Sequence, residues 1–489
     1  MNFSGSMFLF LFIPTVFITI LALPQRLKNV AIVLASLFFF AWGAGWFVLA
    51  LIGTIAVDWL IGFGIDKAKN SRTRKLLLLL DVILNLSLLL WFKYANFFIE
   101  NANTILSALR LNPIIWTKVV MPLGISFVTF SKMTYCLDIA FGKCVATKNF
   151  LHLIEFNLLF PKVIMGPIAQ WASMKDQFEN RVTTTEDFQV GFQRFAVGLF
   201  KKVWIADTIA VYANNIFSMG SAMPFDYAWS GAIIYTLQLF MDFSGYTDMA
   251  VGLMKMMGFS VIENFNHPYI SSSITEFWKR WHISLTTWLR EYLFYPLQYR
   301  TARQKPRKGD IKFNSKTRVY NAMGYFNLFL IFFISGFWHG SGWTYILWGV
   351  YMGILLCLDK AFILAIMQKI PRICSILLTM LLVILGNVLF RSTNIADALA
   401  YFKQMFDFTS YYVHIDMSKV LYINNYGYSM LILAVLISWA PALGGHYEKL
   451  KDFVSRKRTL AAAACLALFA LATIKVATAQ VENFIYFQF

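Results

Sequence analysis

The chain has 489 residues, of which 58% are hydrophobic and only 14% are charged, whereas soluble domains carry about 25% charged residues. Together with a mean hydropathy of +0.60, this composition excludes an ordinary water-soluble globule. The formal net charge of +18 does not indicate a nucleic-acid partner, because the Lys and Arg residues lie in short clusters between apolar runs and form no basic surface interleaved with aromatic residues.

Apolar runs close to the ~20 residues that a membrane-spanning helix needs recur along the whole chain. The first run, residues 7–23, has no basic residue before it and is followed by Arg26 and Lys28. This order favours a retained first helix with its N-terminus outside over a cleaved signal peptide. The predicted helices lie at roughly residues 7–23, 30–43, 45–65, 75–92, 118–141, 190–217, 228–257, 319–340, 343–367, 372–390, 427–443 and 459–479.

Basic clusters separate these apolar runs. They are Lys67, Lys69, Arg72, Arg74 and Lys75; Lys143 and Lys148; eight Lys and Arg residues within 300–318; and Lys449, Lys451, Arg456, Lys457 and Arg458. If each predicted helix crosses the membrane once, all the clusters fall on one side, which the positive-inside rule makes cytoplasmic. The sequence therefore predicts an all-α, polytopic transmembrane bundle with both termini outside.

Two apolar stretches do not fit a simple span. Residues 151–171 are interrupted by Pro161, Lys162, Gly166 and Pro167, which predicts a re-entrant segment, since irregular backbone at membrane depth must be buried in protein or line a cavity. Residues 274–297 mix Trp with charged residues and place Phe277, Trp281, Leu285, Trp288 and Tyr292 on one helical face. This pattern predicts an interfacial amphipathic helix with aromatic anchors.

Several kinds of site have no support in the sequence. The five cysteines, Cys136, Cys144, Cys357, Cys374 and Cys465, form no CxxC pair and no metal-like spacing, so we expect packing roles for them, and neither a metal nor a tightly bound cofactor. No nucleophile elbow, P-loop or HExxH motif is present. Their absence disfavours a serine hydrolase, a pump with its own NTP-driven motor and a zinc protease.

His339 is the first candidate for chemistry. No Asp, Glu, Lys or Arg occurs from residue 319 to residue 358, so His339 is the only group in that stretch expected to titrate near neutral pH. Glycines surround it and allow close packing, and Trp338 and Trp343 can form the wall of a pocket. In this setting a histidine can act as a general base toward an alcohol; the alternative is a buried histidine hydrogen-bonded between helices.

Other candidates lie earlier in the chain. His282, beside Lys279 and Trp281, can bind a donor or assist catalysis, or it is simply a histidine on a surface helix. Asp242 and Asp248 lie within the predicted helix 228–257. Because residues at i and i+6 do not share a helix face, they are not expected to form a catalytic pair. Capping of a broken helix or pairing with a basic group is the structural alternative.

Residues 276–293, which contain His282, closely resemble the signature of the membrane-bound O-acyltransferase family, and residues 337–340 match that family's histidine motif. Residues 122–127, 165–168 and 242–250 look like further family blocks. Residues 91–94 and the tail 484–489 are similar to the bacterial alginate O-acetyltransferase branch. The resemblance covers nearly the whole chain, residues 1–489, as one integral membrane acyltransferase domain.

This resemblance implies a bundle of about eleven to thirteen helices around a funnel or tunnel, in the cytoplasmic (inner) membrane of a bacterium. It implies that His339 is catalytic and His282 a second site residue. It also implies a cytosolic acyl thioester donor such as acetyl-CoA, a polysaccharide acceptor across the membrane and an extracytoplasmic acetyltransferase or esterase-like partner. The candidate substrate- and donor-binding residues are Trp338, Trp281, Lys279, Arg280, Asp242 and Asp248.

Two departures from the alginate branch leave the acceptor open. Pro296 and Leu297 are followed by Gln298 and Tyr299 instead of a glycine pair, and the segment after Trp348 lacks a further histidine that relatives often carry. Two alternatives therefore stay open at this point. One is D-alanyl transfer to teichoic acid, and the other is a polysaccharide or lipid transporter without acyl transfer.

Overall fold

The computed structural model describes residues 1–220, 223–302, 318–409, 423–478, 482 and 484–485, and all regular secondary structure in these ranges is helical. Eight helical segments of the described chain are long and apolar enough to cross a membrane: 25–44, 47–67, 71–108, 322–339, 343–367, 372–391, 425–443 and 458–478. Leu34, Phe38 and Trp42 on one of them are more than half exposed. Exposed side chains of this kind are stable in contact with lipid rather than water, so the chain is an all-α, multi-pass membrane protein.

Every apolar run predicted from the sequence contains a helix. The longer helices are α1 (Ile13–Ala22), α2 (Gln25–Ala44), α3 (Phe47–Lys67), α4 (Ser71–Leu89), α5 (Ala95–Ala108), α6 (Ile125–Ala140), α11 (Thr185–Phe200), α12 (Asp207–Ser218), α13 (Phe225–Met256), α17 (Arg318–His339), α18 (Trp343–Leu358), α20 (Arg372–Arg391), α21 (Ile395–Phe406), α22 (Asn425–Trp439), α23 (Gly445–Arg456) and α24 (Arg458–Thr478).

Two boundaries differ from prediction for local reasons. The run 75–92 continues through a π-helical turn at Leu90–Tyr94 into α5, so the helical segment reaches residue 108. The run 118–141 becomes helical only at Ile125, because Gly124 has a left-handed backbone with φ +77°. A Cβ atom at Gly124 would lie 2.6 Å from the carbonyl oxygen of Val163, so only glycine fits this turn.

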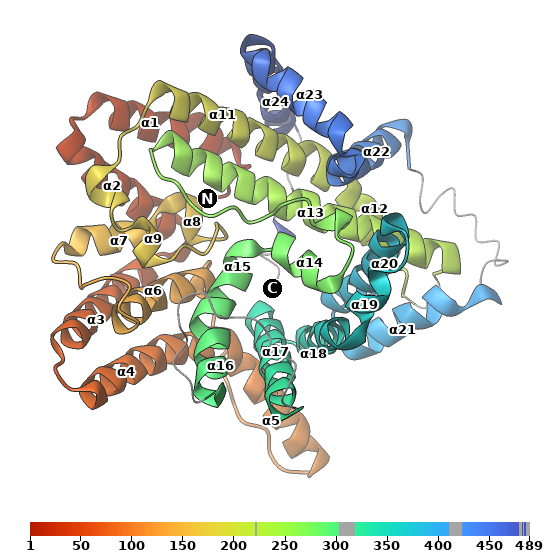
Figure 1. Ribbon diagram of the computed structural model, residues 1–489, viewed down its shortest axis with the longest axis horizontal. Coiled ribbons are helices and arrows are strands. Elements are labelled where there is room, and N and C mark those ends of the chain that lie inside the picture. Colours follow the sequence, from red (N-terminus) through yellow and green to blue (C-terminus); the bar gives the residue numbers. More distant parts are fainter. Residues whose placement is uncertain (221–222, 303–317, 410–422, 479–481, 483, 486–489) are drawn as a thin grey trace. The chain divides into compact units, whose positions relative to one another are not determined.

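The described chain forms two compact units. Unit 1 comprises residues 1–200, 245–262 and 465–488, and unit 2 comprises residues 201–244, 263–464 and 489. Helix α13 contributes to both, since the division falls between Ser244 and Gly245. Within unit 1, α3, α4 and α6 pack against one another, and within unit 2, α17 packs along α18 (Figure 1).

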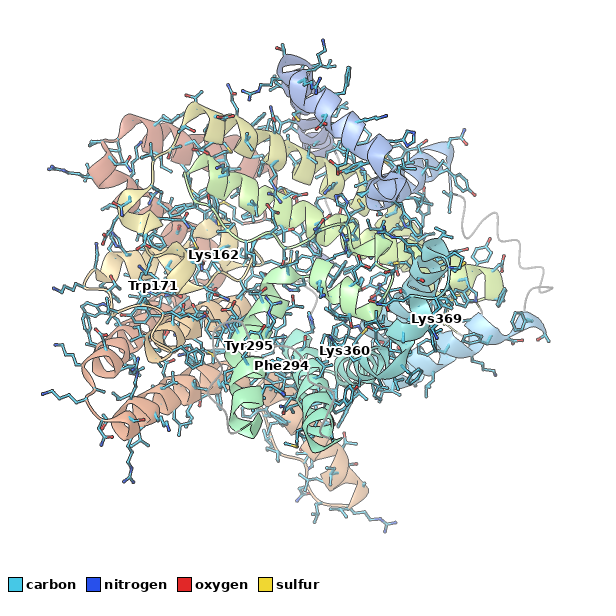
Figure 2. All side chains as sticks on the ribbon, in the orientation of Figure 1. Lys162, Trp171, Phe294, Tyr295, Lys360 and Lys369 are labelled. Atoms are coloured by element: carbon cyan, nitrogen blue, oxygen red, sulfur yellow. The ribbon has the colours of Figure 1, made fainter. Side chains whose placement is uncertain are left out.

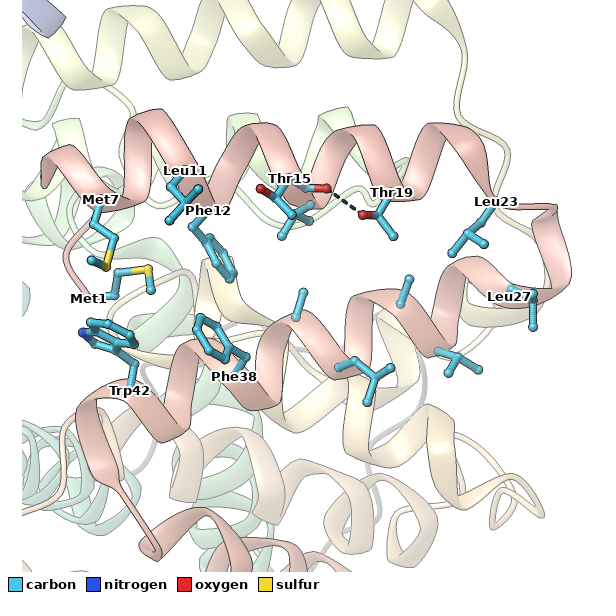
Figure 3. A pocket seen from close by; sticks show the side chains of 15 residues that line it. Met1, Met7, Leu11, Phe12, Thr15, Thr19, Leu23, Leu27, Phe38 and Trp42 are labelled. Atoms are coloured by element: carbon cyan, nitrogen blue, oxygen red, sulfur yellow. Dashed lines mark hydrogen bonds between the residues drawn. The ribbon is translucent and has the colours of Figure 1, made fainter.

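A groove in unit 1 lies between α1 and α2 (Figure 3). Its volume is about 670 Å³, and apolar side chains such as Leu11, Phe12, Phe38 and Trp42 line it. The hydroxyl of Thr19 on this face donates to the carbonyl of Thr15 at 2.7 Å, so its polar atom is satisfied within the helix. This surface suits lipid tails and offers no group for chemistry.

The segment 151–171 is broken, as predicted. Helix α7 (Phe150–Leu158) ends at Leu158, α8 (Phe160–Val163) lasts one turn, and the chain is irregular until α9 (Trp171–Met174). Residues 155–169 are all buried, which meets the requirement that irregular backbone in a membrane protein be enclosed by protein.

The prediction of one helix over residues 274–297 was wrong. The segment forms α14 (Ile274–Arg280), α15 (Ile283–Leu289) and α16 (Tyr295–Ala302), with a break at Trp281 and His282. His282 has a left-handed backbone with φ +47°, which no continuous helix accommodates. The predicted apolar face is nevertheless buried: Phe277, Trp281, Leu285, Trp288 and Tyr292 are each at most 6% exposed. The basic cluster at 300–318 lies mostly outside the described residues.

Candidate functional site

Unit 2 brings the two predicted histidines together. His339 is the last residue of α17, and His282 occupies the break between α14 and α15. Their ring centroids are 6.4 Å apart, and their exposed fractions are 5% and 0%. Two imidazoles that lie 57 residues apart in the sequence therefore share one buried location.

Close packing of α17 on α18 positions His339. A Cβ atom at Gly336 would lie 2.7 Å from the Cα of Gly349 and 2.4 Å from the carbonyl oxygen of Tyr345. The two glycines therefore allow the helix backbones to approach more closely than any larger residue would permit. Because His339 follows Gly336 by one helical turn, this contact determines where its ring lies.

Aromatic rings surround His339. The ring centroid of Trp338 is 5.0 Å away, that of Trp348 is 5.0 Å away and nearly perpendicular, and that of Phe390 is 5.3 Å away. Trp348 and Phe390 also contact each other edge to face at 5.3 Å. An enclosure of this kind limits the access of water and strengthens electrostatic interactions inside it.

His282 is held by Asn264, a residue that sequence reasoning missed. The N–H of Ile283 donates to the backbone carbonyl of Asn264 at 2.9 Å. The side-chain oxygen of Asn264 accepts from the N–H of Ser284 at 3.2 Å and from its hydroxyl at 2.9 Å, and lies 3.1 Å from Nδ1 of His282. Residue 264 thus satisfies the backbone groups that the break in the helix exposes.

The surroundings of His282 keep it neutral. Burial lowers the pKa of His282 to about 3, because a buried imidazolium loses its hydration. Phe243 lies 4.9 Å away, edge to face, and Trp338 lies 6.3 Å away. A neutral imidazole retains one nitrogen lone pair, which general-base chemistry and hydrogen-bond acceptance both require.

The remaining predicted site residues are dispersed. Trp338 lies with the histidines, whereas Trp281 packs against Phe277 at 5.6 Å and Phe265 at 5.0 Å. The ring of Phe243, which contacts His282, lies 6.4 Å from that of Trp281. Arg280 pairs with Glu276 at 2.9 Å, an i,i+4 contact on α14. Of these three residues, which lie on α14 or at its end, Lys279 alone is exposed.

Asp242 and Asp248 both pair with basic groups. Asp242 lies 2.6 Å from Nζ of Lys202, which also contacts Asp207 at 2.7 Å, and all three side chains are buried. In unit 1, Asp248 pairs with Arg194 at 3.0 Å. The structural alternative considered for both residues, pairing with a basic group, is therefore the arrangement observed. Asp242 precedes Phe243, whose ring contacts that of His282 at 4.9 Å.

Two cavities of unit 2 share Thr275 and Lys279 in their walls. The smaller, about 260 Å³, is lined by Trp278, Ile283 and Phe332, with Lys279, Arg290 and Lys360 as its cations; Figure 2 labels Lys360. The larger, about 470 Å³, has a more polar wall that includes Ser272, Glu276 and Arg372. The ring of Trp278 lies 5.8 Å from that of Trp348, which contacts His339.

Asn264, Trp348 and Phe390 belong to the site but were not predicted. No local pattern marks them. Asn264 precedes His282 by 18 residues in an irregular segment, and the other two lie in apolar runs in which every position resembles its neighbours. The one local feature of Asn264 is that it is a polar residue in a loop before the motif. Many loops contain such a residue, so this feature does not identify it.

Comparison with known proteins identifies the family of the chain. Residues 114–308, which include His282, match the membrane-bound O-acyltransferase family. The chain is 38% identical over 441 residues, 89% of its length, to a protein named "Probable alginate O-acetylase AlgI" of Pseudomonas aeruginosa, covering 80% of that protein. It is 30% identical to the peptidoglycan O-acetyltransferase of Helicobacter pylori over 543 aligned residues, which cover all of this chain and 97% of the relative.

A third relative matches a smaller part of the chain. The teichoic acid D-alanyltransferase of Bacillus subtilis is 32% identical over 243 residues, 48% of this chain and 58% of the relative. Alignment over nearly the full length is thus found with the O-acetylating relatives. The chain belongs to the membrane-bound O-acyltransferase family, in its branch of alginate O-acetylase-like enzymes.

Proposed function

We propose that the protein transfers an acetyl group from cytosolic acetyl-CoA toward a hydroxyl of an extracytoplasmic polysaccharide, with His339 as general base and His282 as a second site residue. The observation that supports this most strongly is the pair of buried imidazoles 6.4 Å apart. A separation of this size admits one small group, such as a hydroxyl, between the rings. The near-full-length similarity to O-acetylating relatives supports acetyl as the acyl group.

The proposed reaction is a simple acyl transfer. A hydroxyl is a weak nucleophile, so His339 accepts its proton as the oxygen attacks the thioester carbonyl. The new C–O bond forms, the C–S bond breaks, and the proton on His339 passes to the departing thiolate. The products are an acetyl ester and the free thiol. No ATP is needed at this step because the acyl group arrives already activated.

The aromatic surroundings of His339 support the same chemistry. Trp338, Trp348 and Phe390 leave little room for bulk water near the imidazole. A thioester held in such surroundings is protected from hydrolysis while the hydroxyl is positioned.

The donor side of the proposal rests on the two cavities of unit 2. Lys279, Arg290 and Lys360 at the smaller cavity, and Arg372 at the larger one, provide positive charge for the phosphates of the donor. The more apolar wall of Trp278 and Phe332 suits the pantetheine arm. Because Trp278 contacts Trp348, which in turn contacts His339, the smaller cavity lies two rings from the proposed base.

We propose further that the whole chain is one acyltransferase domain in the inner membrane of a bacterium, and that an extracytoplasmic partner completes the transfer to the polymer. Helix α13 runs without interruption from one compact unit into the other, which favours a common function for the two units. Membership of an O-acyltransferase family argues against transport without acyl transfer.

The test compares two histidine variants, His339→Ala and His446→Ala, in cells that express the protein at matched levels. His446 is exposed on α23 and serves as the matched control. Loss of acetyl groups from the surface polymer is expected only for His339→Ala. Retained acetylation at normal abundance of this variant would contradict the assignment.

D-alanyl transfer is the second candidate, supported by the half-length similarity to a D-alanyltransferase. Purified protein supplied separately with labelled acetyl-CoA and with D-alanine on a thioester carrier distinguishes the two. We expect label transfer from acetyl-CoA. Transfer from the D-alanyl carrier alone would establish the second candidate.

A further inference from the structure

The side chain of Asn264 lies at the centre of the break that contains His282. It is 2% exposed, and its oxygen contacts three groups: the N–H of Ser284, the hydroxyl of Ser284 and Nδ1 of His282. Its backbone carbonyl accepts the N–H of Ile283. One residue thus contacts His282, which precedes α15, and the first two residues of that helix.

These contacts assign the proton on His282. A backbone N–H can only donate, so the Asn264 atom that faces Ser284 must be the amide oxygen and not the amide nitrogen. An amide oxygen can only accept. Nδ1 of His282, 3.1 Å from the same oxygen, must therefore carry the hydrogen. In a neutral imidazole the other nitrogen, Nε2, then carries the lone pair.

We propose that Asn264 is a positioning residue, which holds His282 as the Nδ1–H tautomer and thereby makes Nε2 the hydrogen-bond acceptor beside His339. The geometry carries this assignment without reference to catalysis. Its consequence for the reaction rests on the function proposed above, in which His282 works next to the base.

The backbone conformation of His282 also helps to hold its side chain in one orientation. At His282 the backbone is left-handed, with φ +47° and ψ +51°, a region that non-glycine residues seldom occupy. The hydrogen bonds from residues 283 and 284 to Asn264 compensate for this strain. Strain held at a site by surrounding contacts is typical of residues whose side chain must point in one direction.

With its lone pair on Nε2, His282 can accept a hydrogen bond from a donor group of a substrate bound near His339, while the proton of the attacking hydroxyl passes to His339. The opposite tautomer would present Nε2–H, a donor, at the same place. Asn264 therefore acts through His282 and not on the substrate.

The first experiment measures the tautomer directly. The protein is labelled with ¹⁵N at histidine, purified in detergent, and compared with the variant His282→Gln to identify the His282 resonances among those of the six histidines. We expect a protonated Nδ1 and an unprotonated Nε2 at neutral pH. A protonated Nε2 with an unprotonated Nδ1 in the wild-type protein would overturn the proposal, whatever the activity of any variant.

The second experiment tests the role of the oxygen. Asn264→Leu removes the acceptor at nearly constant volume, Asn264→Asp keeps an acceptor oxygen, and Asn266→Leu makes the same change at an exposed side chain two residues away. For Asn264→Leu we expect kcat to fall by about 10²-fold or more with little change in KM for the donor, as for loss of an oriented acid–base group. Asn264→Asp should retain most of the activity, and Asn266→Leu should resemble the wild type.

The outcomes separate this inference from the proposed function. An unchanged kcat for Asn264→Leu, or a loss in KM alone, would overturn the positioning role. If Asn264→Leu does not accumulate in membranes, the activity of Asn264→Asp and the tautomer measured in the wild-type protein still test the positioning role of Asn264. Retained acetylation in His339→Ala would refute the acyl-transfer mechanism and leave the tautomer measurement unaffected.

Discussion

Two regions of this apolar protein bury polar side chains away from water, and they stabilise those side chains in different ways. In unit 1, Lys132 on α6 lies 3.2 Å from Asp58 on α3, with both side chains at most 4% exposed. In unit 2, His282 and His339 are similarly buried, yet they contact aromatic rings such as Phe243 and Trp348, and lie near each other. The first region pairs its charged groups, whereas the ring contacts described for the second are with uncharged side chains.

The pairing in unit 1 is extensive. Lys132 also donates to the hydroxyl of Thr54 at 2.7 Å, and Asn85 donates to Asp58 at 3.1 Å. In unit 2, Lys202 between Asp207 and Asp242 follows the same principle. Charged groups at membrane depth are stable only with such partners. Breaking such a buried ion pair therefore destabilises the fold, whereas the buried, neutral imidazole of His282 remains chemically available.

The largest effect expected from this comparison is on catalysis. We expect His339→Gln to lower the rate of acetyl transfer by at least about 10²–10⁴-fold, the usual contribution of an acid–base group, with normal protein abundance. The rings of Trp338, Trp348 and Phe390, which contact His339, carry no charge that the substitution would leave unpaired. The rate is measured with purified protein and labelled donor, and abundance by immunoblotting; a large drop in abundance would show that His339 is mainly structural.

The opposite outcome is expected for Lys132→Met. This change leaves Asp58 buried beside no cation, which costs about 3–5 kcal/mol of folding free energy, so thermal stability in detergent and abundance should fall while the activity per folded molecule persists. Adding Asp58→Leu should restore much of the stability, since a buried pair can be replaced by apolar side chains. If Lys132→Met were instead stable and inactive, the unit 1 cluster would belong to the chemistry.

A smaller effect is expected from the contact that places His339. Gly336→Ala introduces a Cβ atom 2.7 Å from the Cα of Gly349. The backbones must separate, at a cost of about 1–3 kcal/mol typical of overpacking, and His339 shifts with them. The control is Gly53→Ala on α3, where a Cβ atom meets open space. Equal melting temperatures for the two variants would show that the α17–α18 contact tolerates more space than the structure indicates.

The smallest effect concerns pH. His282 lies outside the candidate spans, and burial lowers its pKa from about 6.5 to about 3. Between these values the unfolded chain binds the proton and the folded one does not, so stability falls as the pH drops below about 6.5, by at most about 1.4 kcal/mol per pH unit. Thermal unfolding from pH 7.5 to 5.5 should show a weaker dependence in His282→Gln than in the wild type. Parallel curves would indicate that His282 is hydrated.

Part of this site could be predicted from the sequence because the patterns that mark it are local. His339 is isolated in a stretch without charged residues, and the motif around His282 resembles a known family. The segment 274–297 shows the limit of that reasoning. Its apolar face was identified correctly, but the break at His282 was not, because the compensating hydrogen bonds come from Asn264, outside the segment.

By itself, the sequence determined that the protein is a helical, multi-pass membrane protein, since an apolar run of about 20 residues can satisfy its backbone only as a helix in lipid. It also determined which histidines were candidates. Tertiary structure alone decided that these histidines meet, that Phe390 and Trp348 enclose one of them, and that Asp242 is bound to Lys202. These contacts join residues far apart in the chain, and helical periodicity specifies which face a residue occupies but not which helix packs against it.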